Sequence, residues 1–185
     1  MNAFIQQFIP FISKDICWEM DLEAIEGFTD KEIDVFIKEL NIEAHEDFRL
    51  WLKSFGKCSG GLFINDDFFL YRKYDASFHQ APILAQGKIN KAWQQEIVEE
   101  GFITEKELNK KAYFISRENE TSYYFIYTTD PKLLVWHYCD GDDTFECINL
   151  SFIEYLKRYL SNIRCSEGVW FDNSYLLELS TSNLF

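Results

Sequence analysis

Few residues in this chain could do chemistry: it holds three histidines and five cysteines. His137 precedes Cys139 and Asp140, and an imidazole near such groups can act as a base in proton transfer. However, residues i and i+2 on a strand share a face only with each other, and a lone histidine is more often structural. The sequence therefore predicts no catalytic residue at this position.

Patterns that bind metals are incomplete as well. Cys139 and Cys147 with His137 could contribute to a zinc site, but the spacing of the two thiols matches no common ligand hairpin. The run Asp140–Gly141–Asp142–Asp143 is similar to the start of a calcium loop, but it lacks the glycine and the glutamate that such a loop needs farther along. We interpret the run as an acidic hairpin turn and predict neither a metal nor a cofactor.

Motifs of the common enzyme classes are absent from the sequence. There is no glycine-rich phosphate loop, no HExxH pair and no GxSxG elbow. We therefore expect a protein that is not an enzyme. A hydrolase that uses cysteine or histidine chemistry remains the weaker alternative.

The charge of the chain limits its partners. Eighteen Lys and Arg against 31 Asp and Glu give a net charge of −13, which repels phosphate backbones. Direct nucleic-acid binding is not expected. The excess acid serves either solubility alone or attraction to a basic macromolecular partner.

The compartment follows from three features of the sequence. No apolar run approaches the roughly 18 residues that a membrane span needs. The first residues lack the basic start and the apolar run of an export signal. The five cysteines leave an odd thiol however they pair. We expect a cytoplasmic protein without a membrane anchor.

Two helices are expected before the strands. Thr29 and Glu32 form a capping box, in which each side chain accepts a hydrogen bond from a backbone N–H at the helix start, and this predicts a helix over 30–41. A second apolar stripe that stops at Gly56 predicts a helix over 46–55. Residues 4–12 are expected to dock onto the body as an N-terminal helical extension.

The period then changes to that of strands. Apolar runs at 62–64 and 68–71 predict a hairpin, and a helix is expected to end near Glu100. Aromatic and β-branched runs predict an antiparallel meander, which the acidic turn at 140–143 connects to a fourth strand; the runs are 112–116, 123–128, 133–139 and 144–148. One face of this sheet is expected to be core and the other to face a partner.

A last helix is expected to close the core. Ser151 with Glu154 forms its capping box, and an apolar stripe faces inward: Phe152, Tyr155, Leu156, Tyr159 and Leu160. Residues 169–185 are too apolar to leave in water, so they should pack on the body or bind a partner. The predicted fold class is α+β, a mainly antiparallel twisted sheet flanked by helices in a single domain over residues 1–185.

This order of segments resembles the SUKH superfamily, which includes Smi/Knr-type regulatory domains and many bacterial immunity proteins. The resemblance covers about residues 27–160. Its opening is similar to Gly27–Ile33, its second helix to Glu46–Gly56, and its late strand and closing helix to Asp130–Trp136 and Ser151–Leu156. The resemblance implies an α+β fold without an active site.

The function that the resemblance implies is that of an immunity protein, which neutralises a nuclease or deaminase toxin by occupying its functional surface. A regulatory adaptor of the Smi/Knr type, which could bind a client through the apolar tail, is the alternative. Because nucleases present cations to phosphate, an acidic inhibitor can associate under electrostatic steering. Turn position suggests these partner-binding residues: Asp66, Asp67, Asp140, Asp142, Asp143 and Glu146.

Overall fold

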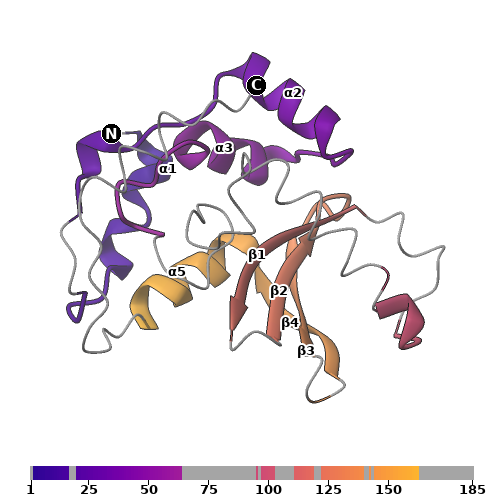
Figure 1. Cartoon of the computed structure of the whole chain (residues 1–185). Helices are drawn as coiled ribbons and strands as arrows, with labels where there is room; N and C mark the ends of the chain where they lie inside the picture. The colour runs from indigo at the N-terminus through magenta and orange to yellow at the C-terminus, as the bar shows by residue number, and fades with distance from the viewer. Residues whose placement is uncertain are drawn as a thin grey trace, which may run out of the picture.

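The computed structural model describes residues 2–16, 20–63, 95, 97–102, 111–118, 122–139, 142 and 144–162. Over these residues the chain has an α+β fold, as predicted, with a four-stranded antiparallel sheet that has the N-terminal helices and the closing helix on one side (Figure 1). The elements in chain order are α1 (Ala3–Gln6), the 3-10 helices η1 (Ile9–Phe11) and η2 (Leu22–Ala24), α2 (Asp30–Glu39), α3 (Glu46–Phe55), β1 (Ala112–Glu118), β2 (Ser122–Tyr127), β3 (Leu134–Cys139), β4 (Thr144–Ser151) and α5 (Phe152–Asn162).

Helix α2 begins at the predicted capping box. The Thr29 backbone N–H donates to Glu32 Oε2 over 2.7 Å, and the Glu32 N–H donates to Thr29 Oγ1 over 3.3 Å. The helix ends two residues before the predicted end because Asn41 adopts a left-handed φ of 51°. This conformation lets the Ile42 N–H donate to the Ile37 carbonyl, the bond that closes a Schellman motif.

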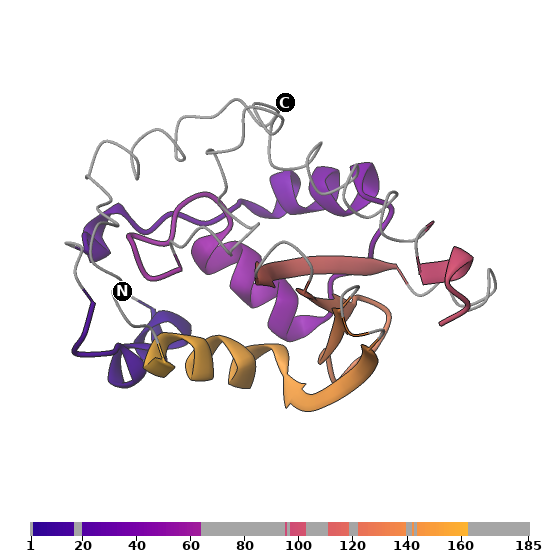
Figure 2. The same cartoon turned by 60° about the horizontal axis from the view of Figure 1, so that its bottom comes forward.

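Helix α3 has the predicted bounds and lies between α2 and α5 (Figure 2). Its apolar stripe includes Phe48, Trp51 and Phe55, none more than 2% exposed. The Trp51 ring packs edge-on against Phe152 of α5, with the ring centroids 5.5 Å apart. This contact joins the N-terminal helices to the closing helix through the main core.

The N-terminal extension docks onto this core, as expected. Phe8 is fully buried, and its ring lies 5.6 Å from both the Phe55 and the Phe63 ring. Pro10 lies in η1, so it interrupts the extension after the short helix α1. Aromatic packing therefore fixes the first dozen residues on α3.

The sheet has the predicted meander order β1-β2-β3-β4. Strands β3 and β4 shift register between Leu134 and Trp136, and Asn149 of β4 has a positive φ of 58°. This irregularity places extra residues in β4, which is why the strand continues to Ser151 instead of ending at 148. On one face, Tyr113, Ile126 and other residues join the main core under the helices.

The expectation that the other sheet face would face a partner is wrong for its central residues. Phe114, Phe125 and Tyr138 point to that face and are fully buried. They pack with Ile97 and Phe102, and the Phe102 ring lies 5.7 Å from the Tyr138 ring. Alternation along the strands therefore produces two apolar clusters, one on each face of the sheet.

The predicted hairpin strand at 62–64 is also wrong where the structure describes it. Leu62 and Phe63 lie in a turn that follows two glycines with positive φ, and both side chains are fully buried. The Ser59 hydroxyl accepts a hydrogen bond from the Phe63 N–H over 3.1 Å, which holds the turn closed. The second predicted strand, at 68–71, and the tail at 169–185 lie outside the described residues.

The helix expected to end near Glu100 is confirmed at its end, since residues 97–99 are helical. Gly101 has a φ of 81°, and the N–H groups of Gly101 and Phe102 donate to the carbonyls of Val98 and Ile97. These bonds form a Schellman motif that stops the helix. It ends beside the buried aromatic face of the sheet, where the Tyr138 hydroxyl donates to Glu100 Oε2 over 2.8 Å.

Candidate functional site

Strand register assembles one side of the candidate site. Tyr124 of β2 lies opposite His137 of β3, and His137 lies opposite Glu146 of β4. Because side chains of paired residues in neighbouring strands point to the same face, these three form one row across the sheet. Ile148 of β4 extends the apolar part of this face towards the main core.

Helix α5 supplies the opposite side. Its start is fixed by the predicted capping box: the Ser151 N–H donates to Glu154 Oε2 over 2.8 Å, and the Glu154 N–H donates to Ser151 Oγ over 3.3 Å. From this start, a stripe at spacing i, i+3, i+4, i+7 faces the sheet row: Tyr155, Arg158, Tyr159 and Asn162.

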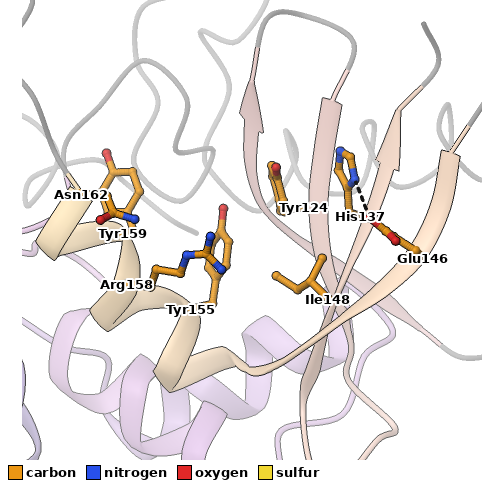
Figure 3. Close-up of a pocket in the computed structure, with 8 residues that line it drawn as sticks. All are labelled: Tyr124, His137, Glu146, Ile148, Tyr155, Arg158, Tyr159 and Asn162. Carbon is orange, nitrogen blue, oxygen red and sulfur yellow. Dashed lines mark ion pairs between the residues drawn. The ribbon is translucent and has the colours of Figure 1, made fainter. Parts of the chain in front are cut away.

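A pocket of about 450 Å³ lies between the sheet row and the α5 stripe (Figure 3). Its size falls within the range of roughly 300–1,000 Å³ that is typical of small-molecule sites. Figure 3 shows that β2, β3, β4 and α5 all contribute lining residues. Three of the lining residues are tyrosines, so the wall is aromatic with polar tips.

Three rings pack in sequence along this wall. The His137 and Tyr124 rings are stacked, with centroids 4.8 Å apart and planes 19° apart. Tyr124 also packs against Tyr155, at 5.4 Å and 30°. Since stacked rings restrain one another's rotation, the imidazole of His137 is held in a fixed orientation relative to α5.

The two nitrogens of His137 have different surroundings. Nδ1 lies 3.8 Å from Glu146 Oε1, too far for a direct hydrogen bond but close enough for charge attraction. Nε2 is buried and has no hydrogen-bond partner among the described residues. A buried polar atom without a hydrogen-bond partner lowers the stability of the fold. Nε2 is therefore a position at which a polar group of a ligand could form a hydrogen bond.

The charged groups at the rim are exposed. The Glu146 side chain is 61% exposed, and Arg158 is exposed and forms no ion pair with a described carboxylate. The pocket therefore offers a guanidinium, an amide, an imidazole nitrogen and aromatic surfaces. These are groups that bind and orient a ligand.

The predicted partner-binding residues do not come together as one described cluster. Asp142 is exposed in the β3–β4 turn, with its Oδ2 atom 3.9 Å from Cys139 Sγ. Glu146 is exposed on β4 but adjoins His137 in the pocket. The remaining candidates lie outside the described residues: Asp66, Asp67, Asp140 and Asp143.

The pocket is not predictable from the neighbours of His137 in sequence, Cys139 and Asp140. The structure pairs His137 with Glu146 across the hairpin, whereas Cys139 is buried and Asp140 is not described. The described residues contain no cluster of three or more His, Cys, Asp or Glu side chains that could hold a metal ion. The sequence held one signal for the His137–Glu146 pair: the number of residues that separates each of them from the β3–β4 turn.

Acids on α2 have basic partners, in contrast to those at the β3–β4 hairpin. Asp30 contacts Arg49 and Lys53 at 3.2 and 2.9 Å, and the hydrogen bond from Lys53, followed by that from Arg49, lowers the pKa of the Asp30 carboxyl. Arg49 also contacts Asp34 at 2.9 Å. The backbone N–H of Thr29, with help from Lys57, lowers the pKa of Glu32. These acids are therefore compensated locally.

Neither a scan against models of known protein families nor searches of curated proteins and of solved structures find a significant match to this chain. Among the described helices, none combines the length and the apolar composition needed to cross a lipid bilayer.

Proposed function

We propose that this protein is a non-enzymatic protein-binding module, an immunity protein that neutralises a bacterial nuclease or deaminase toxin by covering the toxin's functional surface. The observation that carries the proposal is that two exposed acids of the β3–β4 hairpin, Asp142 and Glu146, have no lysine or arginine partner among the described residues. Asp142 is exposed and has no ion pair with a described lysine or arginine. Glu146 is also exposed, and the partner found for it is His137, a weak and conditional counter-charge.

The distribution of salt bridges supports this choice of surface. Among the described bases, Arg49, Lys53 and Lys57 are bound to acids of α2 and the segment before it. The surface of α2 is therefore rich in acidic residues, but its net charge is small because these bases offset them. At the hairpin, the described acids Asp142 and Glu146 have no such basic partner among the described residues, so their charge can attract a basic protein over a distance.

Charge gives a physical reason for a toxin as the partner. A domain that binds or cleaves nucleic acid presents cations to phosphate, and an acidic surface on an inhibitor can occupy those cations in place of the substrate. Such pairs associate fast at low salt because long-range attraction orients the encounter. The net charge of −13 of the whole chain strengthens that attraction.

The order of elements is compatible with the same proposal. Two helices, an antiparallel sheet and a closing helix follow one another as the SUKH resemblance implies. The segments on which the resemblance rests begin at Gly27 and end in α5. All of them have a capping or packing role, so they support a rigid scaffold that presents loops to a partner.

The test uses the protein encoded beside this gene, if it ends in a compact basic module. The purified module and the full chain are mixed in stopped flow, and the association rate is measured with wild type, Asp142→Lys and Glu23→Lys. Glu23 is an exposed acid of η2 and serves as the matched charge control. Asp142→Lys should slow association about tenfold at low salt, with Glu23→Lys much closer to wild type. Equal rates for wild type and Asp142→Lys would remove the hairpin from the interface.

A further inference from the structure

The pocket between α5 and the sheet holds polar groups for which the described residues provide no partner. His137 Nε2 is buried without a hydrogen-bond partner among the described residues. Arg158 has no described carboxylate within ion-pair distance, although acids outnumber bases 31 to 18 in the chain. By contrast, the other arginine whose side chain is described, Arg49, binds two carboxylates. Within the described part of the chain, the Arg158 guanidinium is therefore available to bind an anion.

The surroundings of His137 specify what else such a ligand would carry. Glu146 Oε1 lies 3.8 Å from Nδ1, so Nδ1 faces a carboxylate and Nε2 does not. An imidazole nitrogen that carries no proton accepts a hydrogen bond. A ligand that satisfies it would donate an O–H or N–H from the side opposite its anionic group.

The walls specify the body of the ligand. Tyr159 of α5 and Ile148 of β4 line the cavity, and the Tyr124 and Tyr155 rings, which are in contact with each other, complete its wall (Figure 3). A cavity of about 450 Å³ with aromatic sides suits a flat ring system rather than a bare ion. Arg158 and the amide of Asn162 lie on neighbouring turns of α5 and can bind one anionic group together.

We propose that this pocket binds a small aromatic anion. The ring packs against the tyrosines that line the pocket, a carboxylate or phosphate of the ligand accepts hydrogen bonds from Arg158 and Asn162, and an O–H or N–H at the far end donates to His137 Nε2. A carboxylate and a phosphate can both accept these hydrogen bonds. The carboxylate would belong to an aromatic acid and the phosphate to a nucleotide. The site adjoins the proposed toxin-binding surface at Glu146 but does not include Asp142.

The experiment titrates the full chain by calorimetry with four probes: 4-hydroxybenzoate, benzoate, adenosine monophosphate and inorganic phosphate. At least one of the two ring anions that carry a donor should bind saturably, and inorganic phosphate should bind far more weakly. Preference for 4-hydroxybenzoate identifies the aromatic acid as the source, and preference for adenosine monophosphate identifies the nucleotide. Benzoate lacks the donor and should bind several-fold more weakly than 4-hydroxybenzoate if the acid is the source.

Two variants test the assigned contacts. Arg158→Gln should weaken binding about tenfold or more, because it removes a charge-assisted hydrogen bond. Lys132→Gln removes the same charge from an exposed turn outside the pocket and should leave affinity within about twofold. His137→Phe keeps a ring against Tyr124 and should abolish the advantage of 4-hydroxybenzoate over benzoate.

Two results would overturn the inference. The first is no saturable binding of either ring anion up to about 10 mM, the range in which even weak sites are detected. The second is equal loss of affinity in Arg158→Gln and Lys132→Gln, which would mean that only net charge matters. Circular dichroism of each variant confirms that the comparison is between folded proteins, and neither result bears on the association kinetics of Asp142→Lys.

Discussion

Replacing Gly27 with alanine should destabilise the protein strongly, because the segment before α2 runs directly against the backbone of α3. A Cβ atom at Gly27 would collide with the carbonyl group of Lys53. The neighbouring Phe28 N–H donates to the Leu52 carbonyl over 3.0 Å, so the segment cannot move away without losing that bond. Phe28 itself is buried against Phe36, with ring centroids 5.5 Å apart.

The magnitude follows from these contacts. Inserting a methyl group where backbone atoms cannot give way costs about 1–3 kcal/mol, and loss of the Phe28 hydrogen bond adds about 1 kcal/mol. We expect a loss of about 2–4 kcal/mol in the free energy of unfolding, a large part of the roughly 5–15 kcal/mol of a typical domain. Urea denaturation followed by tryptophan fluorescence measures it.

Gly101→Ala is the matched control for this change. A Cβ at Gly101 meets no atom within 4 Å, so only its φ of 81° opposes a side chain. That strain costs about 1–2 kcal/mol. If Gly27→Ala is no more destabilising than Gly101→Ala, the backbone at Gly27 does not lie as close to the α3 backbone as the structure shows.

Two further predictions concern the helix caps. Glu32→Gln should lower stability at pH 7 by up to about 1 kcal/mol, reduced by screening since a quarter of the side chain is exposed. Because the Thr29 N–H lowers the pKa of Glu32 from its ordinary 4.5, the charged form stabilises the fold above that value, and the difference between variant and wild type should shrink as the pH falls below it in acid titration of stability. Ser151→Ala should lower the free energy of unfolding by about 1 kcal/mol, since the Ser151 hydroxyl caps α5. An unchanged melting temperature in thermal denaturation would contradict this role of the cap.

Local signals in the sequence were sufficient for the helices and the strand order. Thr29 with Glu32 and Ser151 with Glu154 define helix starts within four residues, and the structure has both capping arrangements. Asn41 ended α2 earlier than predicted because a left-handed asparagine has no strong sequence signal apart from its type. The prediction of a strand at Leu62 and Phe63 was wrong because the two glycines before them form a turn.

The pocket could not be predicted in the same way because it depends on register. His137 meets Glu146 only when β3 and β4 pair with the observed offset, and the irregularity at Asn149 changes that offset within the same hairpin. Tyr155 and Tyr159 fit an apolar stripe whether they line a core or a pocket. The structure buries Tyr155 and leaves Tyr159 partly exposed beside Arg158, a distinction that helical spacing does not carry.

We propose that this protein acts by presenting negative charge to a basic protein partner. The association rate of the full chain with a basic toxin module, measured from low to high ionic strength, tests this role. The rate should fall steeply with added salt, and the module in the complex should no longer cleave or deaminate its substrate. A rate independent of salt, or a complex that retains full toxin activity, would contradict it.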